Sequence, residues 1–282
     1  MQYTGKVKLS EGKNLAVNLG FDFDAASVWM GAYGKTSPVY MSRGEFGAEV
    51  AVPRILDLLD DYGIKSTFCV PGHTADTHPD TVKEIIKRGH EICHHSYDHL
   101  DPSEQNYDDE IREIEKGFEA LDRVGAKPVG YRSPGWDFSE NTLSILEKYG
   151  FKYDSSLMGN DFHPYMIRPC TVNMECGNSF GEPSKIMELP VSWYLDDFPH
   201  SEFVMTRTGM KAPSQYYEIW KNHFDYGTSH IKGGMMALTM HPQVTGRAHN
   251  IIVLESFIAY MAENGAEFLT LGQIADRTEM DR

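Results

Sequence analysis

Two histidines four residues apart, His95 and His99, are the feature of this sequence whose type and spacing most directly indicate chemistry. They stand in the polar stretch H-E-I-C-H-H-S-Y-D-H-L-D-P, residues 90–102, which begins with a short β-prone run. If the stretch forms one helical turn, both imidazoles lie on the same side. Imidazole is a common ligand for zinc and similar divalent ions, so the pair needs one further anchor to form a metal site. The alternative is a pair of solvated or packed histidines.

A carboxylate that could complete this site stands in the stretch F-D-F-D, which follows the first β-prone segment of the chain. Asp22 and Asp24 are two residues apart, so they share one face of an extended segment, and a bound cation would relieve their repulsion. Asp24 with His95 and His99 makes a two-histidine, one-carboxylate set that leaves positions open for water and substrate. Asp22 could then take a proton from that water. Alternatively, one of the two aspartates caps the following loop.

Further polar residues stand where other predicted strands end: Arg132, the pair Asp196 and Asp197, and His241. In a parallel barrel the C-terminal strand ends share one rim, so these residues would converge there. The ordinary pKa of histidine lies near neutral pH, so His241 could protonate a departing nitrogen, with Asp196 or Asp197 holding its other ring nitrogen. Arg132 could orient Asp22 or bind a substrate oxygen.

Strands and helices alternate along the chain. Predicted strands cover residues 15–21, 65–70, 90–93, 128–131, a segment from 151, 186–191, 235–240 and 267–271. Predicted helices cover residues 47–62, 77–88, 103–124, 139–148, 213–226 and 249–263, with a short helix at the end. This alternation favours parallel strands with crossover helices in a barrel. Since no linker-like run interrupts it, we expect a single domain over residues 1–282.

The composition limits the partners. Lys and Arg number 26 against 41 Asp and Glu, a net charge of −15, which argues against a nucleic-acid or anionic-membrane surface. The four cysteines fit no Cys-x-x-Cys spacing, so free thiols are expected. No stretch resembles a membrane span, and residues 1–14 lack the apolar core of a signal peptide. We therefore expect a cytoplasmic protein.

Taken together, these stretches resemble the polysaccharide deacetylases (NodB homology, carbohydrate esterase 4). Phe21–Ala25 stands at the first motif, T-F-D-D-G, and His95–His99 matches the metal motif H-[ST]-x-x-H. Arg132–Trp136 matches R-x-P, Trp193–Asp197 lies at the fourth motif, and Leu238–His241 matches L-x-x-H. The resemblance extends from residue 15 to about residue 274 and implies an α/β fold, a distorted (β/α)7–8 TIM-like barrel of the NodB type.

The first motif departs from the family pattern, because one residue separates its aspartates and its glycine is missing. With Ser42–Phe46, Asn160–Tyr165 and His241-Pro242, this variant resembles the branch that holds peptidoglycan-deacetylase-like proteins, allantoinases and cyclic imide hydrolases. By resemblance to this branch we also expect a homotetramer.

The resemblance implies roles for individual residues. Asp24, His95 and His99 would bind one divalent ion, with zinc expected, while Asp22 would act as the base and His241 as the acid. Further residues in or beside the motif stretches are expected to take part, Arg132, Asp196 and Asp197 in catalysis and Glu45, Trp136 and Tyr194 in substrate binding.

The leading interpretation is a metal-dependent hydrolase of non-peptide carbon–nitrogen bonds whose substrate is a small cyclic imide or ureide. The aromatic-rich segments 28–46 and 158–184 show no clear periodicity, so we expect a long loop and a long irregular segment. They favour a small substrate, because they could cover the rim and close the pocket. The alternative is an N-deacetylase of acetylated amino sugars in peptidoglycan-type glycans. A second alternative is a catalytically silent relative that binds a glycan or a metabolite.

Overall fold

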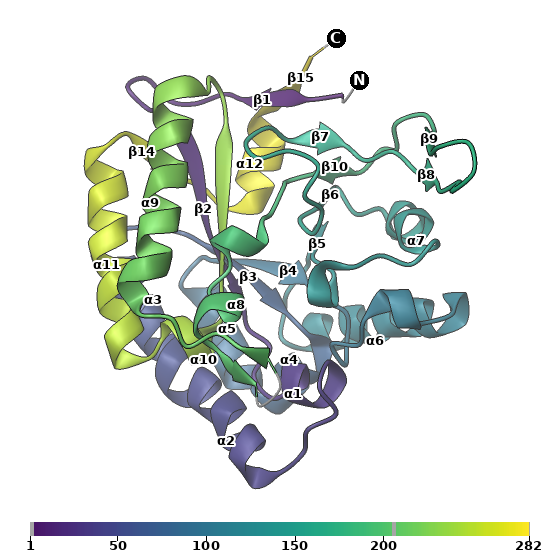
Figure 1. Ribbon diagram of the computed structural model, residues 1–282. Coiled ribbons are helices and arrows are strands. Elements are labelled where there is room, and N and C mark those ends of the chain that lie inside the picture. Colours follow the sequence, from purple (N-terminus) through teal and green to yellow (C-terminus); the bar gives the residue numbers. More distant parts are fainter. Residues whose placement is uncertain (1–2, 205–206, 282) are drawn as a thin grey trace.

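One curled, mostly parallel sheet organises the molecule, whose computed structural model describes residues 3–204 and 207–281 (Figure 1). The strands run in the order β13-β2-β3-β4-β5-β6-β10-β7, and β14 also pairs with β2. All neighbours are parallel except β7, which is antiparallel to β10. The strands are β2 (Leu15–Asp22), β3 (Thr67–Val70), β4 (Glu91–His94), β5 (Gly130–Tyr131), β6 (Tyr153–Asp154), β7 (Tyr165–Met166), β10 (Met187–Glu188), β13 (Met235–Met240) and β14 (Ala266–Phe268).

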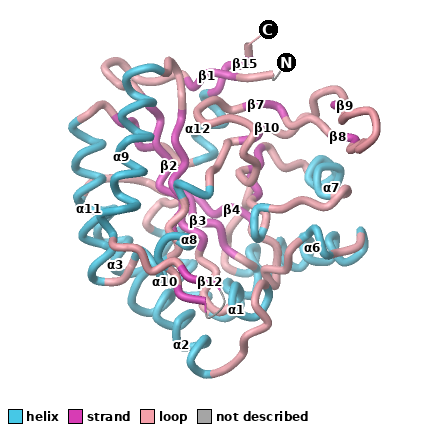
Figure 2. Tube along the Cα trace, in the orientation of Figure 1, coloured by secondary structure: helices cyan, strands magenta, loops and turns pink. Residues whose placement is uncertain are grey.

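The sheet curls into a distorted barrel, as predicted (Figure 2). A parallel bridge between Asp196 and Thr239 joins the segment after β10 to β13, so the chain closes back toward the other side of the sheet. This bridge places Asp196 and Asp197 beside the end of β13. The carboxyl ends of the strands therefore meet on one rim, as they do in other barrels of alternating strands and helices.

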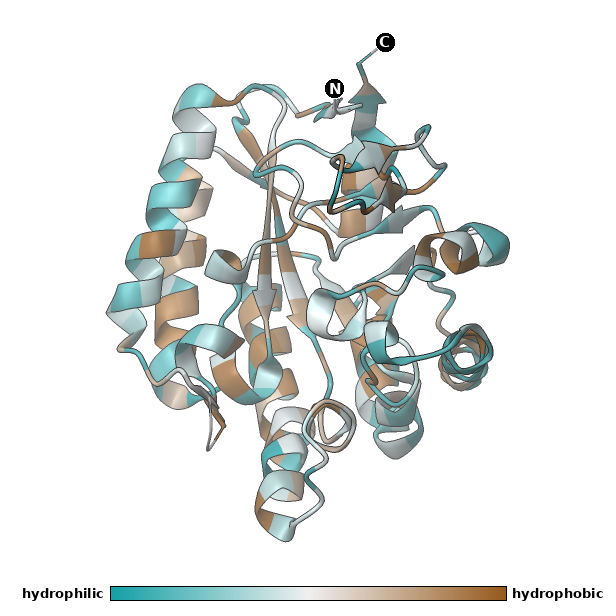
Figure 3. Cartoon of the chain, turned by 45° about the vertical axis from the view of Figure 1, so that its right-hand side comes forward, coloured by the Kyte–Doolittle hydropathy of each residue, from teal (hydrophilic) through white to brown (hydrophobic). Residues whose placement is uncertain are grey.

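Helices cover the outside of the sheet. They are α1 (Ser27–Gly31), α2 (Pro38–Phe46), α3 (Val52–Asp61), α4 (Gly72–Thr77), α5 (Pro79–Lys87), α6 (Tyr107–Arg123), α7 (Thr142–Tyr149), α8 (Phe198–Ser201), α9 (Pro213–His230), α10 (Pro242–Thr245), α11 (Ala248–Glu263) and α12 (Leu271–Arg277). Apolar residues gather along the central strands and the helix faces turned toward them (Figure 3). In α3, for example, Val52, Ile55 and Leu59 are buried, because their spacing places them on one face.

The segment 28–46, which the sequence suggests is a loop, instead folds into α1 and α2. Pro38 occupies the first turn of α2, where its missing N–H costs nothing. Gly44 allows α2 to pack closely, because a Cβ atom there would lie 2.4 Å from the backbone nitrogen of Ala26. Helix α2 therefore packs through its backbone at Gly44 and not through a stripe of apolar side chains. For this reason no apolar periodicity marks the helix in the sequence.

Segment 158–184 is largely irregular, as predicted. It carries β7 and the hairpin of β8 (Cys170–Thr171) and β9 (Ser179–Phe180). Two other short pairings lie outside the predicted pattern: β1 (Gly5–Val7) with β15 (Thr278–Met280), and β11 (Phe203–Val204) with β12 (Arg207–Thr208). The first of these brings the two ends of the chain side by side.

All four cysteines are free thiols, with Cys69 and Cys93 buried and Cys170 and Cys176 exposed. Across the described residues, the chain forms no helix with the length and apolar character that a membrane crossing requires.

Candidate active site

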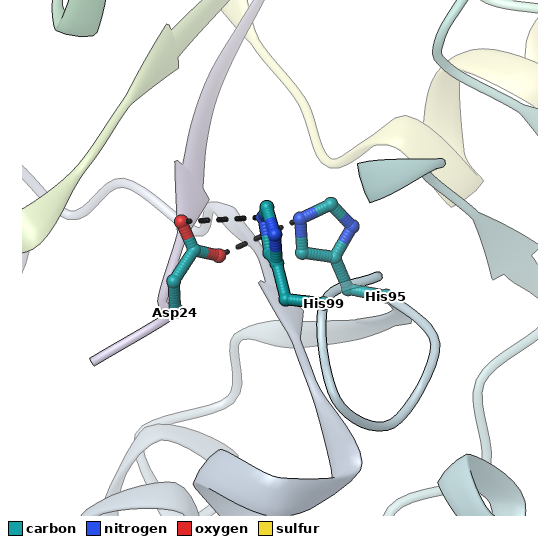
Figure 4. Close-up of side chains that lie close together, drawn as sticks. All are labelled: Asp24, His95 and His99. Carbon is teal, nitrogen blue, oxygen red and sulfur yellow. Dashed lines mark ion pairs between the residues drawn. The ribbon is translucent and has the colours of Figure 1, made fainter. Parts of the chain in front are cut away.

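Asp24, His95 and His99 converge at the carboxyl ends of β2 and β4 (Figure 4). The Nε2 atom of His95 lies 3.5 Å from Oδ1 of Asp24, and Nε2 of His99 lies 3.7 Å from Oδ2. One ligand atom from each residue lies within 4.8 Å of the other two, and all three side chains are buried. The structure thus brings together the predicted metal set.

The loop that carries the two histidines differs from the single helical turn that their spacing suggests. Ser96 and His99 take left-handed backbone angles, with φ of 57° and 58°. The neighbouring His94 supports this conformation at Ser96, because its Nδ1 accepts the Ser96 N–H and its Nε2 donates to the carbonyl of Ile114 in α6. The rings of His95 and His99 then meet edge to face, with centroids 4.9 Å apart.

The donor set fits a divalent cation. Both carboxylate oxygens of Asp24 are buried and have no hydrogen-bond partner among the described residues. Burial lowers the pKa of His99 to about 3 and also lowers that of His95, so both imidazoles are neutral, as metal ligands must be. The carbonyl of Arg132 accepts the Nδ1–H of His95 at 2.6 Å, which leaves Nε2 directed toward Asp24.

Asp22 forms a buried ion pair with Arg132, whose Nη1 donates to Oδ1 at 2.7 Å. Arg132 is itself fixed, because its Nε and Nη2 donate to the carbonyl and hydroxyl oxygens of Ser155. Burial opposes ionisation of Asp22, but the positive charges of Arg132 and His241, together with the hydrogen bond from Arg132, outweigh it and lower the pKa of this carboxyl. Asp22 is therefore ionised at neutral pH and can accept a proton. Of the two roles predicted for Arg132, the structure shows the orientation of Asp22.

His241 is held by Asp197. The Nδ1 atom of His241 lies 2.8 Å from Oδ1 of Asp197, and its backbone N–H donates to both oxygens of the same carboxylate. Thr245 donates a further hydrogen bond to Asp197. Burial opposes protonation of His241, but the charges of Asp196 and Asp197 outweigh it and raise its pKa well above the usual value. The imidazole is therefore able to act as an acid.

A narrow pocket of about 90 Å³ lies over these groups. It is lined by Asp22, Val28, Ala32, Tyr33, His95, His99, Gly135, Trp136, Trp193, Asp196, Phe198 and His241. The pocket adjoins an open groove of about 680 Å³, with which it shares Ala32, Tyr33, His99, Gly135 and Trp193. The site is thus a small pocket that shares one wall with a larger depression.

The residues predicted to bind substrate are only partly brought together. Trp136 lines the pocket and contacts Trp193, with ring centroids 4.3 Å apart. Glu45 is exposed on α2, and Tyr194 is 70% exposed, and neither lines the pocket or the groove. Trp193, and not the predicted Tyr194, lines both the pocket and the groove. An aromatic pair of adjacent residues does not reveal which ring faces inward until the turn between them is known.

Comparison with known proteins gives the family. A family model described as polysaccharide deacetylase matches residues 43–153. The peptidoglycan deacetylase of Helicobacter pylori is 34% identical, with 94% of this chain and 96% of that protein aligned. The chain belongs to the polysaccharide deacetylase family. A peptidoglycan deacetylase-like protein of Gibberella zeae is 30% identical, over 96% of this chain and 88% of its own length.

Solved structures agree with this assignment. A putative polysaccharide deacetylase from Mycobacterium smegmatis is 35% identical and superposes with a TM-score of 0.84, covering 96% of this chain and 92% of the other. Puue allantoinase, at 20% identity and a TM-score of 0.78 over 95% and 91% of the two chains, shares the fold. The resemblance seen in the sequence motifs is therefore confirmed, and the chain is a member of a family of hydrolases that act on carbon–nitrogen amide bonds.

Proposed function

We propose that this protein is a metal-dependent N-deacetylase of acetylated amino sugars within a glycan. The observation that carries the proposal is the junction of the 90 Å³ pocket with the 680 Å³ groove. An acetamido group fits a pocket of that size, and the groove beside it could bind the rest of a sugar chain. A small cyclic substrate would leave the groove empty. The peptidoglycan deacetylase of Helicobacter pylori, similar over nearly the whole chain, supports the same choice.

The proposed chemistry needs a metal-binding set, a base and an acid. A divalent ion held by Asp24, His95 and His99, with zinc proposed, would polarise the acetyl carbonyl and acidify water. Asp22, kept ionised by Arg132, removes the proton from the attacking water.

His241 completes the reaction. Its Nδ1 is bound to Asp197, so Nε2 is the ring nitrogen that can protonate the departing sugar amine. The carbon–nitrogen bond then breaks, and acetate and a free amino sugar are released.

The groove favours a chain of sugars as substrate. A second depression of about 570 Å³, lined in part by Tyr107 and Phe138, continues from it and shares Gln105. Together they offer a path that leads away from the catalytic pocket along α6. The groove wall contains Asp101, Glu104 and Asp109 with only Arg112 opposing them, so a neutral or cationic glycan suits it better than an anionic one.

A small cyclic imide or ureide, the leading interpretation from sequence, becomes the second candidate. The narrowness of the pocket and its apolar walls, which include Val28, Trp136 and Phe198, are the observations in its favour. A catalytically silent protein fits less well, because the acid, the base and the ligand set lie together with suitable charges.

A substrate panel separates the candidates. The protein, loaded with zinc, is incubated with hexa-N-acetylchitohexaose, succinimide, dihydrouracil and allantoin, and acetate release and ring opening are followed separately. We expect acetate from the oligosaccharide, released at least 100-fold more slowly by an Asp22→Asn control. Ring opening without acetate release would transfer the proposal to the cyclic substrates. The homotetramer stays a prediction, which light scattering of the same preparation tests.

A further inference from the structure

Two buried carboxyl groups outside the catalytic pocket, Asp154 on β6 and Glu188 on β10, lie side by side. The two residues are partners in the parallel register of their strands, so their side chains leave the sheet on the same face. Both are completely buried. Two ionised carboxylates this close would repel each other strongly, because water is not there to screen them.

In each carboxyl group, other residues bind only one oxygen, so the second oxygen is left to interact with the neighbouring carboxyl. Oδ1 of Asp154 accepts the hydroxyl of Ser156, and Oε1 of Glu188 accepts the backbone N–H groups of Ser156 and Leu157. Oδ2 of Asp154 and Oε2 of Glu188 receive no donor from any other described residue. A hydrogen bond between the two carboxyls, which the strand register places next to each other, would satisfy both oxygens, and it would require one proton.

The segment held by this pair also holds Arg132. The hydroxyl of Ser156 accepts the Ser133 N–H, and Ser155 accepts two hydrogen bonds from the guanidinium of Arg132. A third bond from the same guanidinium reaches Asp22. The carboxyl pair is thus connected to the base through the Ser155–Ser156 backbone and Arg132.

We infer that Asp154 and Glu188 share one proton and that the singly protonated pair positions Arg132, and through it Asp22. This inference goes beyond the proposed function, which uses neither residue. Loss of the shared proton would leave two adjacent negative charges in a buried site. The Ser155–Leu157 segment would then have to move to let water in, and the hydrogen bonds to Arg132 would move with it.

The surrounding charges agree with a pair that keeps one proton. Arg132 is the nearby cation, and its charge is already matched by Asp22, while Tyr131 and Tyr165 present neutral phenols. Burial raises the pKa of Asp154 to about 6 and that of Glu188 well above its usual value. Because both are raised, the stability that the shared proton provides is present at low and neutral pH. It is lost as the pH rises through the higher of the two values.

Amide substitutions test the shared proton. Glu188→Gln places a permanent N–H donor opposite the Asp154 carboxylate, and its remaining oxygen can still accept the two backbone N–H groups. Asp154→Asn does the same from the other strand. We expect the melting temperature of either variant, measured from pH 6 to pH 10, to fall less toward alkaline pH than that of the wild type. Glu182→Gln, at an exposed glutamate, is the matched control and should follow the wild-type curve.

The double variant Asp154→Asn/Glu188→Gln separates a shared proton from a simple need for polar groups. With two amides facing each other there is no anionic acceptor, so the double variant should melt below both single variants. A double variant as stable as the singles would overturn the inference. So would single variants whose curves run parallel to the wild type, or that fail to fold, since each preserves the hydrogen bond.

If the carboxyl pair positions Arg132 and Asp22, its removal should also slow the reaction. Glu188→Ala should lower kcat for acetate release from hexa-N-acetylchitohexaose at least ten-fold with little change in KM, and Glu188→Gln should restore it and extend the alkaline limb. Equal kcat values for the alanine variant and the wild type would exclude the link to Asp22. The melting curves need no substrate, so they test the pair even if the proposed deacetylation proves wrong.

Discussion

Nδ1 of His241 lies 2.8 Å from Oδ1 of Asp197 but 3.4 Å from Oδ1 of Asp196. The sequence left both aspartates as candidate partners. Asp197 also accepts the backbone N–H of His241, whereas Asp196 accepts that of Phe198 and lines the pocket. Asp197 therefore fixes the orientation of the imidazole, and Asp196 faces the space where substrate would bind.

Replacing Asp197 by asparagine should reduce kcat by about 10²- to 10⁴-fold, because the amide can no longer stabilise the protonated ring. Metal content should be unchanged, since Asp197 lies outside the proposed ligand set and is bound instead to His241 and Thr245. Asp196→Asn is the comparison and should cost less. A larger loss of kcat in Asp196→Asn than in Asp197→Asn would reverse the assignment.

Replacing Arg132 by methionine should move the acid limb of the pH–rate profile toward higher pH. The charge of Arg132 lowers the pKa of Asp22, so without it the carboxyl takes up a proton at a higher pH and the base is lost earlier on acidification. Arg132→Lys, which keeps the charge, should shift the limb less. Identical acid limbs in all three proteins would show that Asp22 is not the base.

Metal binding should depend on Asp24, His95 and His99 together. Each single substitution, Asp24→Asn, His95→Gln or His99→Gln, should weaken zinc binding by more than about 100-fold, measured by competition with a chelating dye. Removing the metal should also lower the melting temperature, because a ligand at 100 times its Kd contributes about 2.7 kcal/mol. Unchanged affinity in the three variants would place the metal elsewhere.

Substitution of Trp193 tests whether the substrate binds in the groove. Its ring is shared by the pocket and the groove, so Trp193→Ala should raise KM for a hexasaccharide roughly ten-fold, the effect of about 1.4 kcal/mol of lost stacking. Tyr194→Ala removes the neighbouring exposed ring and should leave KM near the wild-type value. A greater effect at Tyr194 would mean that the substrate lies along a different path.

Acid should destabilise the protein partly through His94. Burial lowers the pKa of His94 to about 3, whereas the unfolded chain binds this proton near the ordinary value of 6.5. The contribution is therefore present above pH 6.5 and is lost, by about 1.4 kcal/mol per pH unit, as the pH falls toward 3. In urea unfolding, the free energy of unfolding of His94→Gln should fall less steeply than that of the wild type as the pH is lowered from 6.5 toward 3. Equal slopes in the two proteins would indicate that native His94 becomes protonated.

Much of the fold is readable from the sequence where the physical cause is local. The limits predicted for the strand before His241 match β13 (Met235–Met240), because a run of apolar residues ends sharply at a histidine and a proline. Helix α3 is similarly marked by its buried stripe. The strands predicted from residue 151 and over residues 186–191 are also present, as β6 and β10, but each is only two residues long, which is too short for its limits to be read from periodicity.

The site shows the same division. The ligands and the acid–base residues stand at strand ends, where polar types after apolar runs are visible in the sequence. Ser155, Asp154 and Glu188 act through contacts made across strands distant in the chain, so nothing in their local sequence marks them. The left-handed conformation of Ser96 is likewise supported by a hydrogen bond to His94 and is not marked by residue type.

The central claim is that Asp22, His241 and the metal set remove acetyl groups from an acetylated amino-sugar chain. Proton NMR of hexa-N-acetylchitohexaose incubated with the zinc-loaded protein measures this directly, because free acetate gives a resonance distinct from that of the acetamido group. We predict that acetate accumulates with the wild type, and that Asp22→Asn, with the same zinc content, releases it at least 100-fold more slowly. No acetate from the wild type, or equal acetate from both proteins, would contradict the account.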